Sequence, residues 1–208
     1  MESRIGRFVP LLLAGAASLA AGGQDTLAVD PAASRVRVRL GRAGLLKVLG
    51  HDHEIDAPIA EGRVDLVEGD PARSSVRLRF EARRLAVVPG SEPAGDVPKV
   101  EARMRGPEVL DVERYPDVVF ASSSVSGTPI DGGGYRLRIR GTLEVKGRSF
   151  PVEVPVEVRR LGGDVRAEGE VEWRLRDLGV QPPSVAGVVK VADPFRVTFE
   201  ISARPVGR

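Results

Sequence analysis

Apolar and charged residues alternate with a period of two along most of this chain. Segment 34–40 reads SRVRVRL, which places Val36, Val38 and Leu40 on one parity and three arginines on the other. Successive side chains of a β-strand point to opposite faces, so this pattern is typical of antiparallel strands with one buried and one solvated face. The same alternation recurs in segments 75–82, 135–145, 150–158, 164–175 and 196–202.

Shorter apolar stretches at 62–67 and 117–125 bring the expected total to about eight strands, the number that closes a small barrel. Turn-forming runs such as EGDPARSS and GTPIDGGG separate the strands. Closure also removes the exposed edges that a long open sheet would carry. We therefore expect an all-β fold, a closed antiparallel barrel of lipocalin-like type, in a single domain that spans residues 23–208.

One segment departs from the period of two. In residues 96–104 (DVPKVEARM), Val97, Val100 and Met104 recur at three- and four-residue spacing. This spacing is typical of a short amphipathic helix, with Asp96 in the N-cap position. The sequence therefore predicts one short helix beside the barrel.

The N-terminal residues have the features of a secretory signal peptide. Arg4 and Arg7 precede an uncharged apolar run over residues 8–21, and the small residues Ser18 and Ala20 follow the spacing of a cleavage site. The run is shorter than the roughly 20 apolar residues that a membrane anchor needs. We expect a cleaved signal peptide over residues 1–22, export from the cytoplasm, and no transmembrane segment after cleavage.

Composition and motifs exclude several functional classes. The chain has no cysteine, which excludes disulfides, thiolate metal sites and a cysteine nucleophile. Its formal net charge is +2, and its arginines alternate along strands and form no basic patch, so nucleic-acid binding is not indicated. No Gly-x-Ser-x-Gly elbow occurs, and the DGGGY run at 131–135 lies between strands as a turn would. A binding protein without a cofactor is favoured over an enzyme.

The interior of an eight-stranded barrel is either filled by side chains or hollow enough to hold an apolar ligand. The inward parity here carries mostly valine, with some Leu, Ile and Phe and the single tryptophan, Trp173. Valine is small, so this lining is compatible with a cavity. The period of two does not separate the two alternatives.

Three segments resemble the YceI-like polyisoprenoid-binding family. Residues 109–125 (VLDVERYPDVVFASSSV) carry a Tyr-Pro pair before a strand with Phe and Ser. Residues 135–158 carry Gly-Thr-Leu and a Lys-Gly turn between paired strands, and residues 175–203 carry Leu-Gly, Pro-Ser and Val-Lys-Val elements. The resemblance extends from Leu27 to Ala203.

This resemblance implies an extended lipocalin-like barrel in the periplasm, with a short helix beside it and a long isoprenoid chain inside. The chain would then be a lipid carrier and not an enzyme, holding its ligand by burial at about 0.8 kcal/mol per methylene. Its partner would be a long-chain isoprenoid or similar lipid, and its oligomeric state stays open between monomer and homodimer. The candidate ligand contacts are Val36, Val38, Leu40, Val76, Leu78, Phe80, Phe120, Leu137, Ile139, Val154, Val156, Trp173, Phe199 and Ile201.

The only two histidines, His51 and His53, stand in a His-Asp-His motif after Gly50. On a strand their side chains would project to the same side and could share a metal, with Glu54 or Asp56 completing the site. Histidine is also the usual general base. The alternative is a turn in which the imidazoles bond to backbone or to a ligand head group. Two further functions therefore stay open: an envelope metal protein or enzyme that uses these histidines, and a structural barrel with a packed core.

Overall fold

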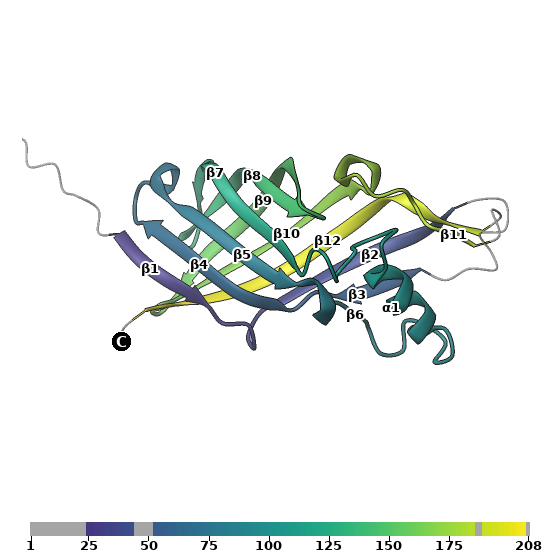
Figure 1. Ribbon diagram of the computed structural model, residues 1–208. Coiled ribbons are helices and arrows are strands. Elements are labelled where there is room, and N and C mark those ends of the chain that lie inside the picture. The colour runs from purple at the N-terminus through teal and green to yellow at the C-terminus, as the bar shows by residue number, and fades with distance from the viewer. Residues whose placement is uncertain (1–23, 44–51, 186–188, 207–208) are drawn as a thin grey trace, which may run out of the picture.

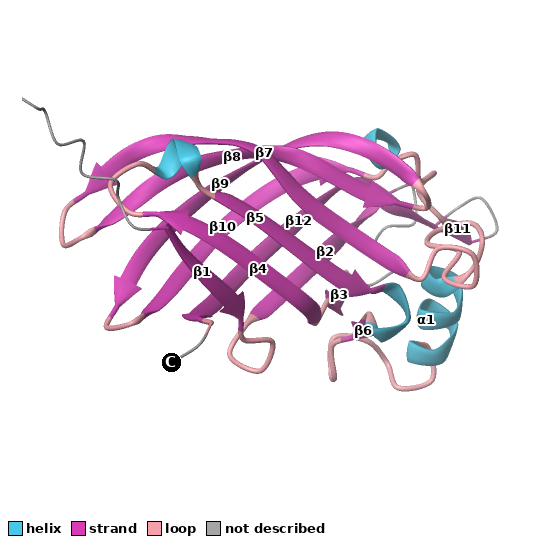
Figure 2. Cartoon of the chain, turned by 60° about the vertical axis from the view of Figure 1, so that its left-hand side comes forward, coloured by secondary structure: helices cyan, strands magenta, loops and turns pink. Residues whose placement is uncertain are grey.

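The computed structural model describes residues 24–43, 52–185 and 189–206, and in these ranges the chain forms one antiparallel sheet wrapped into a barrel (Figure 1). Most strands run obliquely across the barrel, as Figure 2 shows. The strands are β1 (Gln24–Val29), β2 (Arg35–Ala43), β3 (His53–Asp56), β4 (Ile59–Val67), β5 (Ser75–Glu81), β6 (Ala86–Val87), β7 (Asp117–Ile130), β8 (Gly134–Val145), β9 (Arg148–Leu161), β10 (Asp164–Arg174), β11 (Ser184–Val185) and β12 (Val189–Pro205).

The longest strand, β12, closes the barrel. One of its edges pairs with β10, and the other pairs first with β2 and then with β1. Since β1 and β2 follow each other along the same edge of β12, they act as one bent strand, and β3 and β4 continue each other in the same way. The predicted closed antiparallel barrel of eight strands is therefore confirmed, with short extra strands at one end.

Alternation assigns the two faces of the wall as predicted. Leu27 and Ile59 are buried inside, with 0% and 2% of their surface exposed. On the outer face, Glu153 of β9 accepts hydrogen bonds from Arg138 and Arg140 of β8, both at 2.8 Å. The hydrogen bond from Arg140, together with the nearby charge of Arg138, lowers the pKa of the Glu153 carboxyl. Outward-facing charged residues therefore link neighbouring strands through ion pairs on the solvent-exposed face.

A bulge in β7 reconciles two inward residues of opposite parity. Phe120 and Val125 are both buried, although five positions separate them. The pairing of β7 with β8 shifts by one residue between Ser122 and Ser124. An extra residue in one strand turns the following side chains over, so both apolar residues reach the interior.

The ladder between β9 and β10 ends after its first five residue pairs, from Leu161–Asp164 to Glu157–Glu168. Continuing this register would place Pro155 and Pro151 opposite Glu170 and Arg174. Both prolines are paired with β8. Their backbone nitrogens, which carry no hydrogen, therefore lie on the side of β10. Proline removes ladder donors, and this accounts for the early end of the β9–β10 ladder.

Helix α1 (Val97–Arg105) confirms the expected helix to within one residue at each end. Its position beyond one end of the barrel is clear in Figure 1, and the Val87 N–H binds it through the Glu101 carboxylate at 3.0 Å. Asp96 occupies the predicted N-cap position, but its side chain forms no cap hydrogen bond, and its carboxylate accepts a hydrogen bond from Lys99. Among the described residues, no helix is long and apolar enough to cross a membrane.

Two leucines test the assignment of the faces. Leu27 is fully buried and Leu161 is 55% exposed at the end of β9. We expect Leu27→Ala to lower the free energy of unfolding by about 2–5 kcal/mol, because it leaves a void in the core. The matched change Leu161→Ala should alter it by less than about 0.5 kcal/mol. Urea denaturation of both variants measures the difference, and equal losses would show that Leu27 is not in the core.

Candidate ligand-binding cavity

The barrel is hollow. A cavity of about 730 Å³ runs inside the wall, whereas packed protein interiors contain few voids larger than a water molecule. This volume lies within the range of about 300–1,000 Å³ that is typical of small-molecule sites. The fold therefore resolves the alternative that the period of two left open, in favour of a cavity.

Every apolar residue that the sequence assigned to ligand contact lines this cavity. The wall strands bring together Val36, Val38, Leu40, Val76, Leu78, Phe80, Phe120, Leu137, Ile139, Val154, Val156, Trp173, Phe199 and Ile201. Trp173 lies edge-on to Phe195, with ring centroids 6.1 Å apart and planes at 71°. Trp173 is thus a lining residue of the cavity and not part of a filled core.

Two glycines at inward positions make room for aromatic rings. A Cβ on Gly169 would lie 2.5 Å from the Phe199 ring, its direct partner across the β10–β12 ladder. A Cβ on Gly141 would lie 2.8 Å from the ring of Phe120. Both rings therefore lie against the wall, which leaves the centre of the barrel open. Glycine at an inward strand position is the sequence signal for this arrangement.

The two ends of the cavity differ. The end beside α1 is lined by apolar side chains, among them Leu85, Met104, Leu110 and Leu178. These residues belong to α1 and to the segments that connect strands. The period of two applies only to strands, so it does not predict that these residues face the cavity. Further lining residues outside the predicted set include Ile55, Ala57, Leu66, Val109, Val180, Phe195 and Val197.

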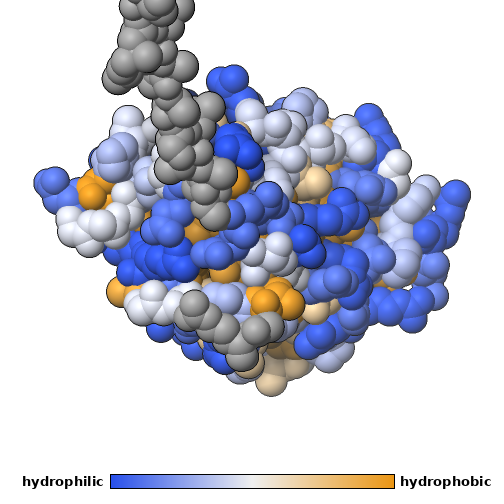
Figure 3. All heavy atoms as spheres, turned by 90° about the vertical axis from the view of Figure 1, so that its left-hand side faces the viewer, coloured by the Kyte–Doolittle hydropathy of each residue, from blue (hydrophilic) through white to orange (hydrophobic). Residues whose placement is uncertain are grey.

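The opposite end is polar, and we call it the η2 end after the turn η2 (Pro71–Arg73) between β4 and β5. Arg160 of β9 binds Asp25 of β1 at 3.0 Å and Glu68, just after β4, at 3.2 Å. Figure 3 looks onto this end and shows hydrophilic side chains over most of it, with small apolar patches between them. Arg160 and Glu68 also line the cavity, so charge borders the apolar interior here.

His53 has a partner that the sequence did not predict. It is paired with Leu40 at the start of β3, and its Nδ1 contacts Oε1 of Glu92 in the loop after β6. The Glu92 side chain is only 2% exposed. The Val88 N–H and the Ser91 hydroxyl also donate to the Glu54 carbonyl, at 2.8 and 3.5 Å, so three contacts attach this loop to β3.

The predicted metal site at His51 and His53 stays untested. His51 lies outside the described residues. Within residues 24–43, 52–185 and 189–206, no group of three His, Asp or Glu side chains gathers that could hold a metal ion. The observed partner of His53 is a buried carboxylate that attaches a loop.

A family model for the YceI-like domain matches residues 27–203, nearly the whole of the barrel. The chain belongs to the YceI-like family. Its fold is similar to that of Burkholderia cenocepacia BcnA, with a TM-score of 0.63 and 21% identity over 84% of this chain and 98% of that one. No curated protein sequence matches the chain significantly.

A second protein with a similar fold comes from Saccharophagus degradans and is described as a polyisoprenoid binding domain implicated in plant cell wall breakdown. Its TM-score is 0.60, with 10% identity over 88% of this chain and 99% of that one. At these sequence identities, the two similarities establish only that the barrel fold is shared. They say nothing about which residues line the cavity.

The contact between His53 and Glu92 has a measurable consequence. We expect His53→Ala to destabilise the protein by about 1–3 kcal/mol, because it leaves a buried carboxylate without its partner. Glu92→Gln should cost less, since an amide oxygen can still accept a hydrogen bond from His53. Thermal denaturation gives the ranking, and hydrogen exchange of residues 88–96 should rise mainly in His53→Ala. A stable His53→Ala variant with an unchanged loop would contradict this role.

Proposed function

We propose that this protein binds and carries a long apolar lipid of the isoprenoid type inside its barrel, and that it acts by binding and not by catalysis. The observation that carries the proposal is the cavity of about 730 Å³ with an almost continuous apolar lining. An apolar chain transferred into such a space gains about 0.8 kcal/mol per methylene. Burial of apolar surface can alone supply the affinity for the lipid, so binding requires no catalytic group.

Family membership supports the choice of ligand. The chain carries the YceI-like domain, and the domain from Saccharophagus degradans with the same fold is described as polyisoprenoid-binding. A branched isoprenoid chain suits a wall built from valine, leucine and phenylalanine, since all of these groups are apolar and need no hydrogen-bond partner. The packed-core alternative is disfavoured by the size of the cavity.

We also propose export to the periplasm, which the basic and apolar segment at residues 1–22 supports. Expression of the full chain in a Gram-negative host, followed by osmotic shock and N-terminal sequencing, tests this. We expect mature protein in the periplasmic fraction, with its first residue between Ala21 and Gln24. Uncleaved protein retained in the cytoplasm would contradict the proposal.

Native mass spectrometry of protein purified from the full-length gene, followed by organic extraction, tests the binding function. We expect a co-purifying isoprenoid lipid, or uptake of prenyl lipids and quinones from vesicles by the delipidated protein. A protein that is free of lipid after purification and takes up none of these compounds would contradict the proposal.

A variant that fills the cavity provides a sharper test. Ile139 lines the cavity in β8, and Thr142 lies exposed on the outer parity of the same strand. We expect Ile139→Trp to weaken lipid binding about tenfold or more, because displacing two methylenes from the cavity already forfeits about 1.6 kcal/mol. Thr142→Trp should bind as the parent does. Titration with a prenyl alcohol compares them, and equal affinities would place the lipid outside the barrel.

A further inference from the structure

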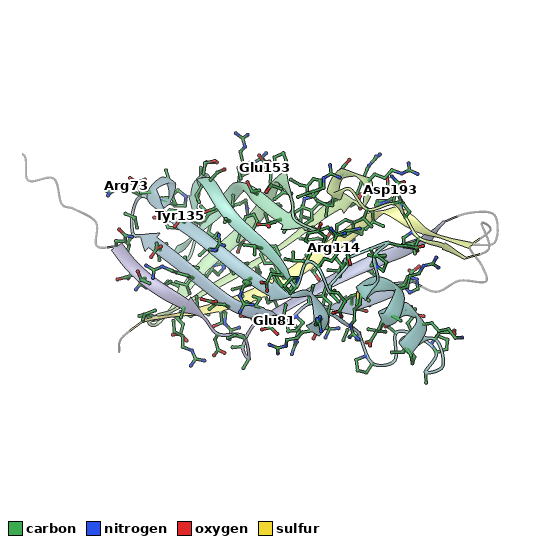
Figure 4. All side chains as sticks on the ribbon, in the orientation of Figure 1. Arg73, Glu81, Arg114, Tyr135, Glu153 and Asp193 are labelled. Carbon is green, nitrogen blue, oxygen red and sulfur yellow. The ribbon has the colours of Figure 1, made fainter. Side chains whose placement is uncertain are left out.

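Polar side chains border the cavity at one end. Among the described residues, those that line it with a hydroxyl or a charge are Glu68, Ser74, Ser75, Tyr135 and Arg160. They come from η2 and its flanks, from the start of β8 and from the end of β9. Figure 4 labels Tyr135 and Arg73, which lie toward this same end. A ligand with one polar terminus would therefore find most of its hydrogen-bond partners at the η2 end.

Strand register places these groups at one end of the cavity. Tyr135 is paired with Val158 across the β8–β9 ladder, and Arg160 follows two residues later on the same face of β9. Asp25 shares its face of β1 with the buried Leu27. The two ion pairs of Arg160, at 3.0 and 3.2 Å, thus join three separate parts of the wall across the η2 end.

The charges within the Asp25–Arg160–Glu68 cluster do not balance. Arg160 contributes one positive charge, and Asp25 and Glu68 contribute one negative charge each, which leaves one negative charge in excess. Arg73 of η2 also lies at this end, but it is exposed and is not among the residues that line the cavity. Arg63 binds Asp65 at 2.8 Å and Arg159 binds Glu157 at 2.6 Å, in both cases on the outer parity.

We propose, on the basis of the proposed function, that the lipid lies with its polar terminus at the η2 end and that this terminus is uncharged. A hydroxyl or carbonyl group can exchange hydrogen bonds with Tyr135, Ser74 and Arg160, which avoids the cost of a buried polar group without partners. A phosphate or diphosphate would meet Asp25 and Glu68 and an arginine that these two already neutralise. The Asp25–Arg160–Glu68 cluster is therefore a specificity determinant that selects alcohols or quinones over phosphorylated lipids.

The size of the effect follows from exposure. The side chains of Arg160, Asp25 and Glu68 are 35%, 44% and 71% exposed, so water and salt screen part of the repulsion. We expect a preference of about tenfold at low ionic strength, decreasing as salt shortens the Debye length from about 30 Å at 0.01 M to about 10 Å at 0.1 M.

Two matched ligands test the proposal: geranylgeraniol and geranylgeranyl diphosphate, which share one chain and differ only in the terminus. Trp173 is the only tryptophan of the chain and lines the cavity, so its fluorescence reports binding of either ligand to the full, delipidated protein. We expect the alcohol to bind about tenfold more tightly at low salt. Equal affinities, or tighter binding of the diphosphate, would overturn the proposal.

Variants assign the preference to the cluster. The double variant Asp25→Asn/Glu68→Gln removes both carboxylates. We expect it to bind the diphosphate more tightly, so that the ratio of the alcohol affinity to the diphosphate affinity falls below about threefold. Glu68→Gln alone changes an exposed side chain and should narrow the ratio without affecting folding. The control Glu144→Gln removes an equal charge from the outer face of β8 and should leave the ratio unchanged. A ratio that persists in the double variant would overturn the role of the cluster, and failure of both ligands to bind the parent would overturn the proposed function itself.

Discussion

Pairing of β12 with β10 on one edge and with β2 and β1 on the other turns a sheet into a closed wall. Without that pairing, the inward parity of each strand would face water on an open surface. With it, the same residues enclose a space of about 730 Å³. The cavity, its lining and the two different ends all depend on this one set of backbone hydrogen bonds.

The size of that space comes from side-chain volume and from where the rings lie. Valine at Val36, Val154 and Val156 covers the wall without reaching the barrel axis, and Gly141 and Gly169 allow Phe120 and Phe199 to lie flat against it. A larger residue at either glycine would push a ring inward. The cavity therefore depends on which residues this chain has at the inward positions, and not on the barrel fold alone.

The strands and their faces could be predicted from sequence because alternation is a local signal with a direct geometric meaning. The ends of the barrel could not. Leu110 and Leu178 reach the cavity from connecting segments that have no period, and the contact of His53 with Glu92 joins positions 39 residues apart. The cluster of Asp25, Glu68 and Arg160 likewise depends on closure of the barrel, which brings residues that are far apart in the sequence into contact. Such contacts follow from the fold and not from any local pattern.

The early end of the β9–β10 ladder bears on whether another molecule can add a strand to this sheet. Strand segments that leave the ladder offer unpaired backbone groups, on which another molecule can add a strand and begin to aggregate. Pro151 and Pro155 remove the donors from one of these edges, and the charged Glu170 and Glu172 stand along the other. The two prolines that end the β9–β10 ladder therefore also make this part of the sheet a poor template for a strand of a second chain.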